Sequence, residues 1–131
     1  MGSFPPDRLA AFFSAAHRGV TAAYLFGSEA RNEARADSDV DIAVLFDVAP
    51  DPALMGAALT LEGDLERHLA RPVDLVVLNT APADLVHRVL RDGVIVFDRD
   101  PARRIRFEVA RRNEFFDLQP IYRAYRRTGS R

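Results

Sequence analysis

The sequence predicts an α/β (α+β) fold: one small domain in which helices pack on a mixed four-stranded sheet, in two layers. A length of 131 residues, with 48% hydrophobic and 28% charged residues, is typical of one compact globular domain. Segments with helical spacing alternate with strand-like apolar runs in the order α-β-α-β-α-β-α-β. Neither an internal repeat nor a low-complexity linker interrupts this order, so residues 1–131 are expected to form one domain.

The first half of the chain predicts two helices separated by two strands. Apolar residues at helical spacing predict a helix over residues 6–18. A run rich in β-forming residues predicts a strand over 21–26, and a mostly apolar run predicts a second over 40–46. Between them, residues 29–34 are expected to form a short helical segment. Leucines and an alanine at three- and four-residue steps then predict a helix over 54–70.

The second half of the chain predicts two more strands and two more helices. An apolar run predicts a central strand over 73–78, and a short helix is expected over 85–90. After a glycine turn, residues 94–97 predict the last strand. An aspartate and a proline at 100 and 101 fit the start of a C-terminal helix, so 100–131 is expected to be a basic helical segment, kinked or restarted at Pro120.

Composition restricts the chemistry and the location. The chain has no cysteine, so a catalytic metal would be held by carboxylate or carbonyl oxygens or by imidazole nitrogens. Such a ligand set favours Mg²⁺. It has no recognisable signal segment, and no apolar stretch approaches the roughly 20 residues that span a bilayer. We therefore expect a cytoplasmic protein without a membrane anchor.

Charge is distributed unevenly along the chain. Residues 1–99 carry nine arginines against fifteen acidic residues, a net of −6, whereas 100–131 carry nine arginines against four, a net of +5. The basic segment could bind an acidic partner or nucleic acid, or it could be a solvated helix face that packs its aromatic residues on the sheet. Its candidate partner-binding residues are Arg103, Arg104, Arg111, Arg112, Arg123, Arg126 and Arg127, interleaved with Phe115, Phe116, Tyr122 and Tyr125.

Paired carboxylates open the second predicted strand. Asp39 and Asp41 lie two residues apart, so the two-residue period of a strand points both side chains to one face. Two adjacent carboxylates repel each other, and a divalent cation relieves that repulsion. Taken alone, the segment is better explained as a polar turn with side-chain caps.

Gly27 and Ser28 precede this pair by about ten residues, at the end of the first predicted strand. A glycine lets the backbone approach a phosphate closely, and a serine hydroxyl can donate to a phosphate or cap a helix. A helix beginning here would aim free amides at phosphate oxygens. On its own the dipeptide is an ordinary strand-to-helix turn, but together with Asp39 and Asp41 it indicates a metal–nucleotide site.

Asp74 interrupts the otherwise apolar third strand. Burial of a lone carboxylate is costly unless a metal or hydrogen-bond donors compensate it, so Asp74 is a candidate third carboxylate beside Asp39 and Asp41. The alternative is an aspartate at a strand end that faces water.

The segment from Gly27 to Val44, with Gly-Ser followed by Asp-Ser-Asp-Val-Asp at 37–41, resembles the signature of the minimal nucleotidyltransferases of the DNA polymerase beta-like superfamily. The resemblance implies a single nucleotidyltransferase palm domain. It implies that Gly27 and Ser28 bind the triphosphate of ATP and that Asp39 and Asp41 coordinate Mg²⁺, with two ions expected. Asp74 would be a third metal ligand that orients or deprotonates the attacking hydroxyl.

The resemblance also implies a biological role. Small stand-alone members resemble the antitoxin half of two-gene modules, in which the partner is a HEPN-type ribonuclease toxin. We therefore expect transfer of AMP from ATP to a protein acceptor, a tyrosine of such a toxin, within a homo- or hetero-oligomer that the sequence leaves open. Two alternatives are transfer to an aminoglycoside-like small molecule and an antitoxin that binds its toxin without catalysis. Direct nucleic-acid binding is not expected, since no RNA-binding motif is present.

Overall fold

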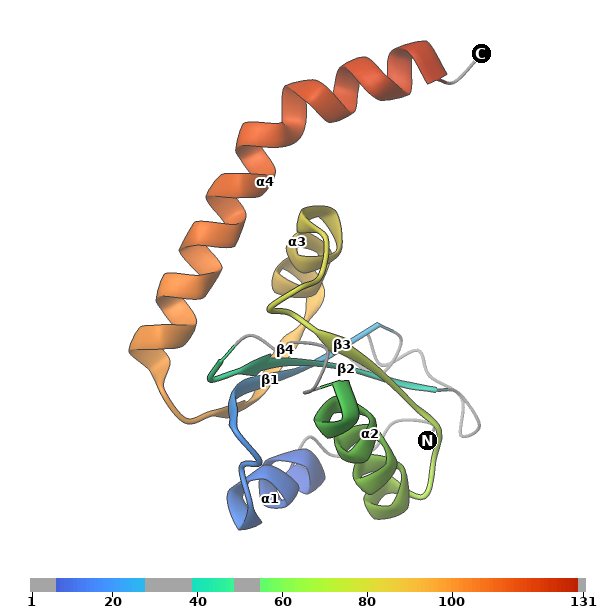
Figure 1. Ribbon diagram of the computed structural model, residues 1–131, viewed down its shortest axis with the longest axis vertical. Helices are drawn as coiled ribbons and strands as arrows, with labels where there is room; N and C mark the ends of the chain where they lie inside the picture. The colour runs from blue at the N-terminus through green and yellow to red at the C-terminus, as the bar shows by residue number, and fades with distance from the viewer. Residues whose placement is uncertain (1–6, 28–38, 49–54, 130–131) are drawn as a thin grey trace.

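A computed structural model describes residues 7–27, 39–48 and 55–129, with the backbone alone described from 118 onward. The four described helices lie around one sheet (Figure 1), and the elements follow the predicted order except for the helix expected between the first two strands, which lies outside the described residues. The elements are α1 (Asp7–Ala15), β1 (Val20–Phe26), β2 (Val40–Phe46), α2 (Met55–Leu69), β3 (Val73–Val77), α3 (Ala83–Asp92), β4 (Val94–Asp98) and α4 (Pro101–Gly129).

The four strands form one mixed sheet in the order β3-β2-β1-β4, which confirms the predicted sheet type. β1 pairs antiparallel with both β2 and β4, whereas β2 and β3 are parallel and are connected through α2. The central strands β1 and β2 are buried along nearly their whole length. Such burial on both faces explains why their sequences read as continuous apolar runs.

Helices cover both faces of the sheet, so the expectation of two layers is wrong and the domain has three. One core lies between the sheet and α1 and α2, around Phe13 of α1 and Leu65 of α2. The other lies on the opposite face, where Val86 of α3 and Phe107 of α4 pack against Tyr24 and its neighbours. Figure 1 shows α1 and α2 on one side of the sheet and α3 and α4 on the other.

Among the described elements, all predicted boundaries but one lie within two residues of the observed ones; the exception is the end of α1, which was expected at residue 18 and lies at Ala15. α3 begins two residues earlier and ends two residues later than the predicted 85–90. α4 continues through Pro120 as one helix, which rules out the predicted restart, and its change of direction in the C-terminal part agrees with the alternative prediction of a kink (Figure 1). The expected helical segment 29–34 lies outside the described residues.

A buried polar network fixes α4 to the sheet. The Tyr24 hydroxyl of β1 donates a hydrogen bond of 2.7 Å to Glu108 of α4, and both residues are buried. Arg104 joins this network by pairing with Glu108 at 3.0 Å and with Asp98 of β4 at 2.9 Å. Burial, followed by the neighbouring Glu108 carboxylate, raises the pKa of Tyr24 well above its ordinary range. The network therefore holds a neutral tyrosine against a charged pair.

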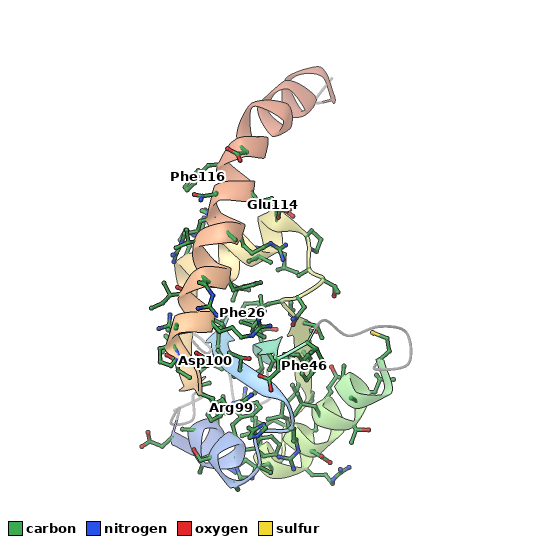
Figure 2. All side chains as sticks on the ribbon, turned by 60° about the vertical axis from the view of Figure 1, so that its left-hand side comes forward. Phe26, Phe46, Arg99, Asp100, Glu114 and Phe116 are labelled. Atoms are coloured by element: carbon green, nitrogen blue, oxygen red, sulfur yellow. The ribbon has the colours of Figure 1, made fainter. Side chains whose placement is uncertain are left out.

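Several arginines assigned to a partner surface contact the domain itself. Arg103 donates to the Phe46 carbonyl at 2.9 Å, and Arg111 donates to the Ala81 carbonyl at 2.6 Å. With Arg104 bound as described above, three of the seven candidates stabilise the docking of α4. Arg112 pairs with Glu108 at 3.7 Å, and the other three lie where only the backbone is described. Figure 2 shows Arg99 and Asp100 at the base of α4, and Glu114 and Phe116 farther along it.

Candidate active site

The candidate residues lie where three adjacent strands meet at one end of the sheet. In the observed register Phe26 of β1 faces Asp41 of β2, and Asp41 faces Asp74 of β3. Residues directly opposite on neighbouring strands point to the same face. Asp41 is therefore at the centre of a row whose side chains lie on the α3 and α4 side of the sheet.

A cavity of about 450 Å³ opens over this row. Its sheet side is formed by Phe26, Gly27, Asp41, Asp74 and Val76. Its other side is formed by α3, through Leu85, Arg88 and Asp92. The cavity thus contains the two carboxylates that the sequence predicted to converge from different strands, and it has a volume suited to a small-molecule ligand.

Gly27 has a backbone conformation and a contact that exclude a side chain. Its φ is +71°, in the left-handed region that favours glycine. An added Cβ would lie 2.9 Å from Cγ of Asp41 and closer still to its Oδ2. The Asp41 carboxylate therefore lies directly against the Gly27 backbone, which joins the predicted phosphate loop to the predicted metal-binding residues.

Asp39 does not share the position of Asp41 and Asp74 in the cavity. Asp39 lies one residue before β2, is exposed and does not line the cavity. Within the described residues, no three acidic or histidine side chains are close enough to hold a metal ion together, so Asp39, Asp41 and Asp74 do not form a preassembled three-carboxylate group. Ser28 lies outside the described residues, as do Asp37 and Ser38.

Asp74 is exposed, so its carboxylate carries no cost of burial that a metal ion would need to offset. It occupies the second position of β3, where the strand is still open to solvent. Its place opposite Asp41, rather than its burial, makes it part of the candidate site.

The α3 side of the cavity was not predicted from the sequence. Leu85, Arg88 and Asp92 are spaced by three and four residues, which places them on one face of the helix. The buried residues Ala83, Val86 and Val89 form the adjacent face. This second stripe is the signal that could have predicted an α3 surface beside the core-facing one.

A second cavity, of about 380 Å³, lies at the opposite end of β1 and β2, where it is lined by Gly19 and Phe46 among others. Asp47 lines it and accepts hydrogen bonds from Thr21 and Arg99. Partial burial raises the pKa of Asp47, but these two donors outweigh it and hold the pKa below its usual value. Since the described lining of this cavity is mostly apolar and contains one carboxylate rather than a pair, the first cavity is the better candidate active site.

Comparison with known proteins agrees, for most of the chain, with the resemblance to nucleotidyltransferases. A sequence profile of the family described as "Polymerase beta, Nucleotidyltransferase" matches residues 9–102. A protein adenylyltransferase, MntA, from Thermococcus cleftensis is 40% identical over 78 residues, which are 60% of this chain and 76% of that protein. The matched family range includes β1, β2 and β3 and therefore every described candidate active-site residue on these strands.

Solved structures share the fold over nearly the full length. A chain of a toxin–antitoxin complex with AMP-PNP superposes with a TM-score of 0.81 at 24% identity, covering 98% of this chain and 100% of that one. A chain from a Shewanella oneidensis complex of a tri-AMPylated HEPN toxin with an MNT antitoxin gives a TM-score of 0.73 at 24% identity, covering 95% and 97%. At these identities the likeness establishes the fold, including the long C-terminal helix.

Proposed function

This chain belongs to the polymerase beta nucleotidyltransferase family, and we propose that it transfers AMP from ATP to a protein acceptor. The single observation that carries the proposal is the contact between Gly27 and the carboxylate of Asp41, opposite Asp74, in a cavity large enough for a ligand. It brings a glycine that can approach phosphates to the carboxylates that can hold a metal ion.

The donor set fits Mg²⁺, although no three-carboxylate group is preassembled among the described residues. Mg²⁺ commonly binds through one or two carboxylates together with substrate phosphates. Asp41 and Asp74 would supply those carboxylates, and Asp39, two residues before Asp41, would join them when nucleotide is present. Two bound ions would neutralise the triphosphate and stabilise the attacking and leaving oxygens.

The chain's own residues position the reactants. Gly27, with Ser28, would hold the triphosphate by its backbone and hydroxyl donors. Asp74 would orient the acceptor hydroxyl or accept its proton. The acceptor oxygen would form a bond to the α-phosphorus, and the bond from that phosphorus to the α,β-bridging oxygen would break, so that pyrophosphate leaves with the electron pair. Of these groups, Gly27 and Asp74 line the cavity.

A tyrosine of a HEPN-type toxin is the proposed acceptor, which would make the protein an antitoxin. Support comes from the MntA relative, which is named a protein adenylyltransferase, and from the fold shared with an antitoxin bound to an AMPylated HEPN toxin. α4 extends beyond the sheet and would offer the acceptor protein a surface (Figure 1). Ile105, Val109 and Phe116 are exposed apolar residues on this helix.

The proposal places the reaction in the cytoplasm, where ATP and a ribonuclease toxin would both be present. In the described ranges, no helix has both the length and the apolar character needed to cross a membrane.

Transfer of label from α-³²P-ATP to the co-purified toxin tests the proposal. The wild-type protein should label the toxin, and a variant with Asp39→Asn and Asp41→Asn should not, while retaining its melting temperature within a few degrees. Unchanged neutralisation of the toxin by this double variant would support an antitoxin that binds without catalysis. Labelling of an aminoglycoside in place of the toxin would contradict a protein acceptor.

A further inference from the structure

The α3 side of the cavity carries a cation, whereas the described part of the sheet side carries none. Among the described residues that line the cavity, Arg88 is the one basic side chain. It is exposed and makes no hydrogen bond or ion pair within the described part of the chain. The next arginine along the helix differs, because Arg91 is held by Asp92 through two contacts of 2.9 Å.

The other charged residues in the described lining of the cavity are acidic. Asp41 and Asp74 line the sheet side of the cavity, and Asp92 lines the α3 side. Asp92 is also the last residue of α3, so the partial negative charge of a helix C-terminus adds to the carboxylates. A polyanion would enter this cavity only if cations compensate those charges, and the carboxylate-bound metal ions would act on the sheet side.

Close packing holds the C-terminal end of α3 against β1. A Cβ added to Gly93, the residue that follows the helix, would lie 3.5 Å from Cβ of Phe26 and 3.4 Å from the Leu25 carbonyl oxygen. The backbone that carries Arg88 is therefore fixed relative to the strand that ends in Gly27. A fixed backbone with an exposed, unpaired guanidinium is suited to bind an incoming ligand rather than to stabilise the fold.

We propose that Arg88 binds the triphosphate of the nucleotide substrate from the α3 side of the cavity, opposite Asp41 and Asp74. This inference rests on the proposed nucleotidyl transfer and extends it to a residue outside the family motif. A guanidinium presents a planar fork of donors that matches two phosphate oxygens, and it keeps its charge at any working pH. Arg88 is thus a substrate-binding residue that acts alongside Gly27 and Ser28.

Binding of AMP-PNP in the presence of Mg²⁺, measured by isothermal titration calorimetry, tests this assignment in the full-length protein. Arg88→Gln should weaken binding about tenfold, the size of one lost charge-assisted contact, and should raise the KM for ATP by a similar factor. Arg88→Lys keeps the charge but loses the planar fork of donors, so its affinity for AMP-PNP should lie between those of the wild type and Arg88→Gln. Arg67→Gln is the matched control, since this arginine lies on α2, across the sheet, and is 74% exposed.

Melting temperatures separate a binding defect from a folding defect. All three variants should melt close to the wild type, because Arg88 forms no described contact and Arg67 forms only an exposed surface pair with Asp64. An AMP-PNP affinity of Arg88→Gln within twofold of the wild type would overturn the assignment. So would an unchanged AMP-PNP affinity with a raised KM for the acceptor protein, which would place Arg88 at the acceptor. A wild-type protein that fails to bind AMP-PNP would contradict the proposed function itself.

Discussion

Substitution of Gly27 by alanine should damage the active site more than the fold. The left-handed φ of +71° costs an alanine about 1 to 2 kcal/mol in the free energy of unfolding. The added Cβ also occupies space now held by the Asp41 carboxylate, with Cγ of Asp41 only 2.9 Å away. That carboxylate must move by about 1 Å, and displacements of this size in a catalytic group can cost about 100-fold in rate.

Gly19→Ala is a matched control for the strain alone. Gly19 has a similar φ of +77°, but an added Cβ there would meet nothing within 4 Å. Urea denaturation should therefore show a comparable loss of stability in both variants, whereas labelled AMP transfer should fall about 100-fold only in Gly27→Ala. If Gly27→Ala transferred AMP at the rate of Gly19→Ala, the close approach of Gly27 to Asp41 would have no catalytic importance.

Three further predictions concern stability and metal dependence. Tyr24→Phe removes the hydrogen bond to Glu108 and should cost about 1 kcal/mol at pH 7 by urea denaturation. Because burial and Glu108 raise the pKa of Tyr24, the protonated tyrosine stabilises the fold below about pH 10, and this contribution is lost as pH rises further. Above pH 10 the Tyr24→Phe variant should therefore lose less stability than the wild type. An equal loss in both proteins would contradict the pKa shift. The pKa of Asp47 is lowered overall, since hydrogen bonds from Thr21 and Arg99 outweigh its desolvation, so its contribution is present above about pH 4 and is lost as pH falls. Asp47→Asn should therefore show a flatter fall in melting temperature below pH 4, and an unchanged acid profile would contradict the shift. Mg²⁺ should bind much more tightly with AMP-PNP present than without it, because the described carboxylates form no complete metal group. Equal Mg²⁺ affinities by calorimetry would count against a metal site that the carboxylates share with the nucleotide phosphates.

The fold was largely predictable because each element has a clear period or composition. The strand over 40–46 has the predicted bounds, and the leucine spacing located α2 to within one residue at each described end. The number of layers was not predicted, although the continuous apolar run of β2 is typical of a strand covered on both faces. Helical periodicity shows which side of α3 is apolar, but not which face of the sheet it will cover.

The candidate site was predictable where it depends on strand geometry and not where it depends on a helix. A two-residue period and parallel pairing are enough to bring Asp41 opposite Asp74. The part played by Arg88 depends on how α3 lies over the sheet, which is a tertiary property. The expectation for Asp74 was right in its location and wrong in its reason, since the residue is exposed at the start of β3.

The strand order has a consequence for synthesis on the ribosome. β1 lies in the interior of the sheet, yet its second neighbour, β4, is made about 70 residues after β1 ends. At typical rates of synthesis this interval lasts roughly 4 to 14 s, during which one edge of a hydrophobic strand has no native partner. Unpaired strand edges promote aggregation. We therefore expect the nascent chain to be most vulnerable between the completion of β1 and the arrival of β4, and slower translation of this interval should lower the yield of folded protein.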